Sequence, residues 1–175
     1  ANVTTVDITP DVILSSSYLL DINSDGTNDF KFTANKICAC VGAVCQATVA
    51  IQPISAESCV MAGSSNEGVY YSVDDTSHYT SNTGVYTKLF SYGDIISLNE
   101  NCSGENTRIF ICSYGSCPPS SASGYSTYGA ILGAGVKYIP IRYGNFLGWI
   151  KIGFDPATYN LKIYESAISK DNISN

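Results

Sequence analysis

The chain has 175 residues, which is enough for one domain with a sizeable hydrophobic core. Charged residues make up only 14% of it, and the net charge is −6 with no cluster of Lys or Arg, which argues against a nucleic-acid partner. No apolar run approaches the ~20 residues that a membrane-spanning helix requires. The composition, which is low in charge and rich in Gly, Ser, Thr, Asn and Tyr, is typical of secreted β proteins. We therefore expect an extracellular or cell-surface location.

Short apolar runs and alternating patterns, bounded by turn residues, dominate the chain, and helical periodicity is nearly absent. The predicted strands cover residues 2–8, 11–15, 18–22, 29–36, 46–52, 68–73, 85–91, 94–99, 107–113, 127–132, 135–143, 146–154 and 159–166. This spacing predicts an all-β fold, an antiparallel β-sandwich that could be jelly-roll-like, in a single domain over residues 1–175. Residues 38–66 are the least regular segment, and a short helix could lie there.

The N-terminal residues 2–8 alternate, with Val6 and Ile8 on one face and Val3 on the other, and Pro10 follows at once. Two hypotheses remain open for this segment. It could be the first strand of its own sandwich. Alternatively, residues 1–9 could be an exchanged strand that completes the sheet of a second copy by β-strand addition. The second hypothesis predicts self-association through the N-terminal strand.

Residues 21–29 read Asp-Ile-Asn-Ser-Asp-Gly-Thr-Asn-Asp, with oxygen-bearing side chains at relative positions 1, 3, 5 and 9 and glycine at position 6. Ca²⁺ binds about six to eight oxygens, and such spacing points them inward. The predicted ligands are the side chains of Asp21, Asn23, Asp25 and Asp29 and the backbone carbonyl of Thr27. An EF-hand loop would close with Glu at position 12, where this chain has Phe32, and the flanking residues read as strands. We therefore predict a calcium-binding hairpin loop; the alternative is an Asx-rich turn without an ion.

The chain contains seven cysteines: Cys38, Cys40, Cys45, Cys59, Cys102, Cys112 and Cys117. Together with the predicted calcium loop, this number favours an extracellular disulfide framework. A metal–thiolate site is disfavoured, because no C-x2-C spacing occurs and His78 is the only histidine. The pairing cannot be deduced from the sequence, but Cys112 and Cys117 flank a plausible turn and are the best local pair. The odd number leaves one thiol free, buried or paired with another chain.

Residues 136–143 and 146–152 form the most regular part of the sequence and are expected to pair across a turn at Gly144 and Asn145. Both faces of each strand carry apolar side chains, which predicts central strands. Residues 161–164 are expected to add the third strand of a meander. Pro140 lacks an N–H donor, so it should lie at a bulge or an edge position.

Three segments together resemble a known class of proteins. They are the loop Asp-Ile-Asn-Ser-Asp-Gly-Thr-Asn-Asp-Phe at 21–30, Gly-Asp-Ile-Ile at 93–96, and the C-terminal hairpin with Tyr-Ile-Pro-Ile-Arg-Tyr at 138–143, Gly-Trp-Ile-Lys-Ile at 148–152 and Ile-Tyr-Glu at 163–165. Their order is similar to that in secreted surface proteins of Bacteroidetes-type bacteria. The chain departs from that pattern at Pro140, where the pattern has glycine, and in a shorter hairpin turn. The resemblance implies a non-catalytic module of adhesins and secreted surface proteins.

The sequence favours binding or structure over catalysis. His78 lies alone in a polar segment, and no G-x-S-x-G nucleophile motif is present, so we predict that the protein is not an enzyme. The first functional hypothesis is a structural or adhesive module, such as a subunit of a secreted filament or fibre. The alternative is a calcium-dependent carbohydrate-binding module that recognises surface glycans through exposed aromatic rings. The aromatic residues considered for sugar stacking are Trp149, Tyr70, Tyr71, Tyr79, Tyr86, Tyr125 and Tyr128.

Overall fold

The computed structural model describes residues 3–39, 44–63, 67–71, 76–80, 86–97, 99–105, 107–114, 125–128, 135–155 and 160–169. The strands are β1 (Val3–Leu14), β2 (Ser17–Leu20), β3 (Phe30–Ala39), β4 (Val44–Pro53), β5 (Ser58–Gly63), β6 (Glu67–Tyr71), β7 (Thr76–Thr80), β8 (Tyr86–Thr87), β9 (Cys102–Ser103), β10 (Thr107–Tyr114), β11 (Tyr125–Tyr128), β12 (Gly135–Tyr143), β13 (Phe146–Asp155) and β14 (Asn160–Ser169). In the part of the chain that the structure describes, no helix could cross a membrane.

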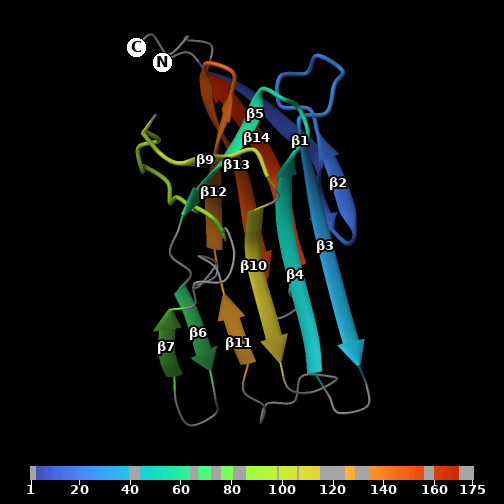
Figure 1. Cartoon of the computed structure of the whole chain (residues 1–175). Coiled ribbons are helices and arrows are strands. Elements are labelled where there is room, and N and C mark those ends of the chain that lie inside the picture. Colours follow the sequence, from blue (N-terminus) through green and yellow to red (C-terminus); the bar gives the residue numbers. More distant parts are fainter. Residues whose placement is uncertain are drawn as a thin grey trace.

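The strands form two layers that face each other, and the two layers are joined where β5 of the first pairs with β8 of the second (Figure 1). The first layer has the order β1-β14-β13-β12-β5, with β9 beside β5. The second layer has the order β2-β3-β4-β10-β11-β6-β7, with β8 beside β10. Neighbouring strands are antiparallel, apart from a single parallel bridge between Arg108 and Tyr86. The predicted all-β antiparallel sandwich is therefore confirmed.

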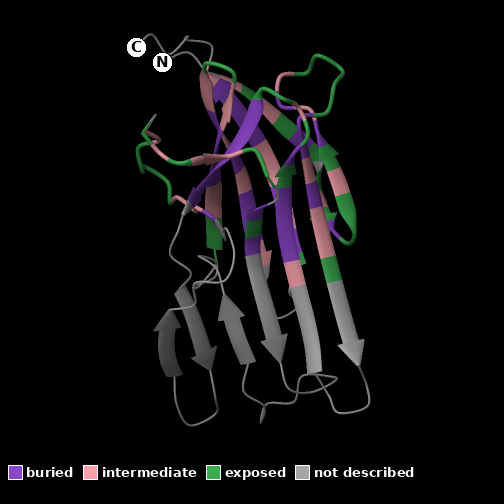
Figure 2. Ribbon diagram, viewed as in Figure 1, coloured by how far each residue is buried: buried purple, intermediate pink, exposed green. Residues whose placement is uncertain are grey.

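The hydrophobic core lies between the two layers, and Figure 2 shows its buried segments on strands of both. Every second residue of the central strands points inward, as the two-residue period of a β-strand requires. The largest fully buried side chains are Phe30, Phe32, Ile22, Ile51, Met61, Ile109, Ile139, Ile141, Ile150, Ile152 and Leu161. The outer face of the first layer, which points away from the core, is therefore free to carry aromatic and charged side chains.

The C-terminal meander has the predicted form. β12 pairs with β13 from Gly135 opposite Phe154 to Tyr143 opposite Phe146, and β14 follows on the other side of β13. Gly144 in the connecting turn has a φ of +54°, which favours glycine. The hairpin and its turn are therefore confirmed.

Pro140 lies at a gap in the pairing of β12. Tyr138 exchanges two backbone hydrogen bonds of 2.9 Å with Phe90, so the backbone N of Pro140, two residues on, faces the same side of the strand. Pairing with β5 on that side begins only where Ile141 lies opposite Val60. The missing N–H therefore costs no ladder hydrogen bond, although β12 lies between β13 and β5 and its pairing with β13 is regular at Pro140, so the predicted bulge or edge position was wrong.

Other expectations were wrong. Residues 58–63 form β5 inside the segment where a short helix was considered. Residues 94–97 and 99 are not in a strand, because the chain turns just before them, where Asp94 N donates to Ser91 O over 3.2 Å. The segments predicted separately at 2–8 and 11–15 are one strand, β1, with a register shift between Asp7 and Val12.

One disulfide joins the two cysteines Cys59 and Cys102, whose Cα atoms are 5.6 Å apart, and so links β5 to β9. This confirms that the cysteines form a disulfide within the chain, although the pair differs from the local one that was preferred. Cys117 of the predicted Cys112–Cys117 pair lies outside the described residues, so that pairing stays a prediction.

Gly148 in β13 is a position where any side chain would clash with the neighbouring strand. A Cβ atom there would lie 2.4 Å from the backbone oxygen of Ala167 in β14. Because backbone cannot give way like a flexible side chain, we expect Gly148→Ala to lower the free energy of unfolding by about 1–3 kcal/mol. Urea denaturation of the variant measures this loss.

The matched control is Gly104→Ala, because a Cβ atom at Gly104 would meet nothing within 4 Å. This variant should stay within about 0.5 kcal/mol of the unchanged protein. Equal stability of the two variants would contradict the close approach of β13 and β14.

Candidate functional site

The predicted calcium loop connects β2 to β3, which are antiparallel neighbours with Leu20 opposite Phe30. Asp29 N donates to Leu20 O over 2.8 Å and closes the base of the loop. Gly26 has a φ of +90° and Ser24 a φ of +61°, so the chain turns sharply at both residues. The predicted position of the loop, between two antiparallel strands, is confirmed.

The Asp21 carboxylate organises the first half of the loop. Its Oδ1 accepts hydrogen bonds from the backbone N–H groups of Asn23 (3.2 Å), Ser24 (2.7 Å) and Asp25 (3.3 Å). Its Oδ2 accepts one from Gly26 N over 2.7 Å. The loop is therefore wrapped around a carboxylate, as in an Asx turn.

Asp25 holds the second half of the loop. Its Oδ1 accepts from Thr27 N over 2.7 Å, and its Oδ2 accepts from Asn23 Nδ2 over 2.9 Å. Asn23 Oδ1 in turn accepts from Asp25 N over 3.0 Å. The Thr27 N–H, and next the Asn23 amide, lower the pKa of Asp25, which keeps this carboxylate ionised.

Asp29 is the predicted ligand whose buried carboxylate a bound cation would stabilise. It is only 1% exposed, its Oδ2 accepts from Ile22 N over 3.0 Å, and its Oδ1 has no hydrogen-bond partner. Burial raises the pKa of Asp29, and the negative charges of Asp21, Asp25 and Glu57 raise it further. A buried carboxylate oxygen without a partner is costly, and a bound cation would remove that cost.

The oxygen donors of this loop fit a hard cation such as Ca²⁺, and the free Oδ1 of Asp29 is one atom that could bind it. The structure does not bring the carboxylates together as a metal cage. Among the described residues, no three His, Cys, Asp or Glu side chains form a group that could hold a metal ion. Asp21, Asn23 and Asp25 instead hydrogen-bond within the loop, so calcium binding stays a prediction.

A second candidate site lies on the outer face of the first layer, where side chains of β12, β13 and β14 line a pocket of about 360 Å³. Its aromatic and charged lining includes Phe90, Tyr92, Tyr138, Trp149, Lys151 and Glu165. The rings of Tyr138 and Trp149 meet edge to face, with centroids 5.2 Å apart. We call this the Trp149 pocket.

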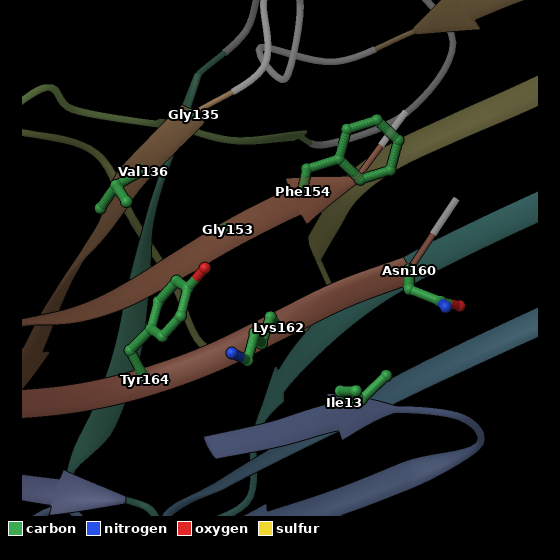
Figure 3. A pocket seen from close by; sticks show the side chains of 8 residues that line it. All are labelled: Ile13, Gly135, Val136, Gly153, Phe154, Asn160, Lys162 and Tyr164. Carbon is green, nitrogen blue, oxygen red and sulfur yellow. The ribbon is translucent and has the colours of Figure 1, made fainter. Parts of the chain in front are cut away.

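A third hollow, of about 320 Å³, lies further along β13, and Figure 3 shows its lining. It includes Ile13, Val136, Gly153, Phe154, Lys162 and Tyr164. The Tyr164 ring stands beside Gly153, where a Cβ atom would lie 2.5 Å from the Tyr164 hydroxyl. We call this the Tyr164 pocket.

Of the aromatic residues predicted to stack on sugars, Trp149 lines a pocket. The side chains of the others, and that of His78, lie outside the described part of the chain; these tyrosines are Tyr70, Tyr71, Tyr79, Tyr86, Tyr125 and Tyr128. The sequence reasoning missed Tyr92, Tyr138 and Tyr164. For Tyr138 the sequence contained a signal. Pairing across the turn at Gly144 and Asn145 puts Tyr138 opposite Lys151, and two-residue alternation puts Lys151 on the same face as Trp149.

No protein-family model matches the chain, and no curated protein or solved structure matches it at a significant level.

Proposed function

We propose that the protein is a non-catalytic extracellular or cell-surface module with a structural or adhesive role, acting as a subunit of a secreted filament or fibre. The observation that carries this proposal is the position of β1 at the edge of the first layer, with β14 as its neighbour. The Cys59–Cys102 disulfide supports an oxidising compartment. The resemblance of the loop and hairpin to secreted surface proteins supports the same location.

β1 is built in two parts. Residues 3–7 pair with residues 165–169, whereas residues 12–14 pair with residues 161–163, and the register shifts between the two parts. An interruption of this kind allows the first part to be exchanged while the second part stays in place. The same backbone hydrogen bonds would then form between two copies, as in β-strand addition and domain swapping.

Deletion of residues 1–9 tests the filament proposal. We expect the full chain to form polymers that electron microscopy can detect, and the truncated chain to remain a folded monomer in which residues 165–169 of β14 have lost their neighbour. Deletion of residues 1 and 2 alone is the matched control, because it leaves the paired residues 3–7 intact. This control should still polymerise.

Two outcomes would contradict the exchange. A full chain that stays monomeric at high concentration with calcium present would show that β1 serves its own sheet. A truncated chain that unfolds would show that residues 1–9, which include the buried Ile8, belong to the core of the same copy.

We further propose that Ca²⁺ binds the loop between β2 and β3. The ligands would be the side chains of Asp21, Asn23, Asp25 and Asp29 and the carbonyl of Thr27. The proposal is supported by the buried, unpartnered Oδ1 of Asp29 and by the oxygen-rich spacing of the loop. In this role the ion would stabilise the hairpin, as in many extracellular modules.

Carbohydrate binding is the second candidate function, and one observation favours it. Trp149 is the only tryptophan of the chain and is half-buried in a pocket on the outer face of a sheet, beside Tyr138. Partly exposed aromatic rings next to a few charged groups are the usual composition of a small-ligand pocket.

A further inference from the structure

We infer that the outer face of β12, β13 and β14 binds a neutral oligosaccharide, with the Trp149 pocket and the Tyr164 pocket as adjoining subsites. This inference rests on the carbohydrate-binding candidate and does not depend on the filament proposal.

One wall of the Trp149 pocket is a turn that presents an aromatic ring to solvent. Asp94 N donates to Ser91 O, Ser91 N donates to Asp94 Oδ2 over 2.8 Å, and Gly93 has the positive φ of +95° that a type II turn needs at its third position. This geometry places Tyr92 at the second position, where its side chain is 91% exposed. A large aromatic side chain at such a position gains little from folding, and because Tyr92 lines the pocket, its ring is free to contact a ligand there.

The turn is fixed to the sheet below it. Phe90 exchanges backbone hydrogen bonds of 2.9 Å with Tyr138, and Lys137 Nζ donates to Ser91 Oγ over 3.1 Å. The Tyr138 ring meets the Trp149 ring at an interplanar angle of 89°. The Tyr138 and Trp149 rings and the backbone of the turn are therefore held in place before a ligand arrives, which lowers the entropy cost of binding.

The polar part of the Trp149 pocket suits hydroxyl groups. Lys151 Nζ lies 2.8 Å from Glu165 Oε1, so an ammonium donor and a carboxylate acceptor stand side by side, and both are partly exposed. A sugar hydroxyl can both donate and accept, and can therefore bind to such a pair.

The same pair indicates which sugars are preferred. Glu165 already neutralises the Lys151 ammonium, and Asp94 adds a further negative charge to the pocket lining. Lys162, which lines the Tyr164 pocket, is likewise paired with Asp11 over 2.8 Å, so among the described residues that line the two pockets a sulfated or uronic-acid sugar would meet no ammonium without a carboxylate partner. The ligand that fits is neutral.

A β-bulge connects the two pockets. Lys151 lies opposite Glu165, but the next residue, Ile152, lies opposite Ile163, so Tyr164 is an extra residue in β14. The bulge lets consecutive residues line the same outer face, with Glu165 in the Trp149 pocket and Tyr164 in the Tyr164 pocket. Bulges that redirect a side chain in this way are common beside functional sites.

The length of the face indicates an oligosaccharide rather than a single sugar. Trp149, Lys151 and Gly153 alternate along β13 and therefore share one face. The distance from Trp149 to Gly153 is about 13 Å at the usual rise of a strand. A ligand that contacts both pockets must span this distance, and the Lys151 ammonium, 5.8 Å from the centre of the Tyr164 ring, lies between them.

The single tryptophan provides a direct test. The full chain is titrated with neutral hexasaccharides of glucose, N-acetylglucosamine, mannose, galactose and xylose, while Trp149 emission is recorded and calorimetry measures binding independently. We expect at least one hexasaccharide to change the emission saturably. Tyr92→Ala should weaken its affinity at least tenfold. Ile95→Ala, which removes another exposed side chain (87%) of the same segment but none of the pocket lining, should change it less than twofold.

A second comparison tests the two-subsite arrangement. Tyr164→Ala should weaken the hexasaccharide at least fivefold but leave the disaccharide of the same sugar unchanged, because the disaccharide occupies the Trp149 pocket alone. Equal losses for both ligands would overturn the second subsite. Tighter binding of a sulfated hexasaccharide than of the neutral one would overturn the assignment of a neutral ligand.

The two measurements distinguish failure of the site from failure of the function. Heat of binding without a change in Trp149 emission, and with full affinity in Tyr92→Ala, would overturn this site while leaving carbohydrate binding in place. If neither measurement detects any of the five hexasaccharides at 10 mM or so, carbohydrate binding itself is overturned together with the site.

Discussion

Loss of the Cys59–Cys102 disulfide is expected to lower the free energy of unfolding by about 4 kcal/mol. The two cysteines are separated by 43 residues, so their bond closes a long loop and removes much conformational freedom from the unfolded chain. For a domain of this size, the melting temperature should fall by about 10 °C. Calorimetry of the double variant Cys59→Ala/Cys102→Ala, compared with the unchanged protein without reducing agent, measures the effect.

The single variants are the control for this experiment. Either substitution alone already breaks the covalent link, so Cys59→Ala and Cys102→Ala should each lose about as much stability as the double variant. If the two single losses instead add up to the double loss, the cysteines act as independent packing side chains and the covalent link contributes little.

Calcium is expected to raise the melting temperature by about 8 °C when its free concentration is about 100 times its dissociation constant. At that concentration, binding to the folded state alone stabilises it by about 2.7 kcal/mol. In Asp29→Asn this rise should largely disappear. In EDTA, however, the variant should be at least as stable as the unchanged protein, because a neutral amide replaces a buried carboxylate whose Oδ1 has no partner.

Asp94→Asn is the matched control, since Asp94 also accepts a backbone hydrogen bond in a turn but lies outside the calcium loop. It should retain the full calcium effect. An equal calcium-dependent rise in Asp29→Asn and in the unchanged protein would show that the ion does not bind this loop.

The dependence of stability on pH should identify the same residue. The pKa of Asp29 is raised in the folded state, chiefly by burial, so the folded protein binds this proton more tightly than the unfolded chain does. In EDTA, the ionised Asp29 therefore destabilises the folded protein fully at pH values above its folded pKa. This destabilisation is relieved as the pH falls through the folded pKa toward the ordinary pKa of 3.8. The stabilisation by calcium should shrink over the same range, because protons compete for the carboxylate. Asp29→Asn should remove both effects.

The local sequence pattern was sufficient to predict the parts of the fold that depend on residues close together in the chain. The hairpin of β12 and β13 was predicted because alternation and a glycine turn act within a few residues of each other. The calcium loop was placed between two strands for the same reason. β9 was not predicted, because two residues carry no periodicity, and it depends on β5 and a disulfide that lie far away in the sequence.

The residues of the candidate sites also divide into those that a local pattern indicates and those that depend on distant contacts. Trp149 and the acidic loop were recognised from residue type and spacing. Tyr92 joins the Trp149 pocket only because Phe90 pairs with Tyr138, a long-range contact that no local pattern encodes. Tyr164 faces the same side as Glu165 only because of the bulge, and strict alternation would have placed these consecutive residues on opposite faces.

The adjacency of β1 and β14 has a mechanical consequence. Val3 lies opposite Ser169, so the outer ends of these two strands are neighbours (Figure 1). Tension applied through those ends would act along the hydrogen bonds, which run perpendicular to antiparallel strands, and would open them one at a time like a zipper. A copy whose residues 3–7 were paired with β14 of another copy would instead be pulled along the strands, so that all of these hydrogen bonds would share the load. Exchange of β1 would thus turn the segment that peels most easily under force into the strongest joint between two subunits.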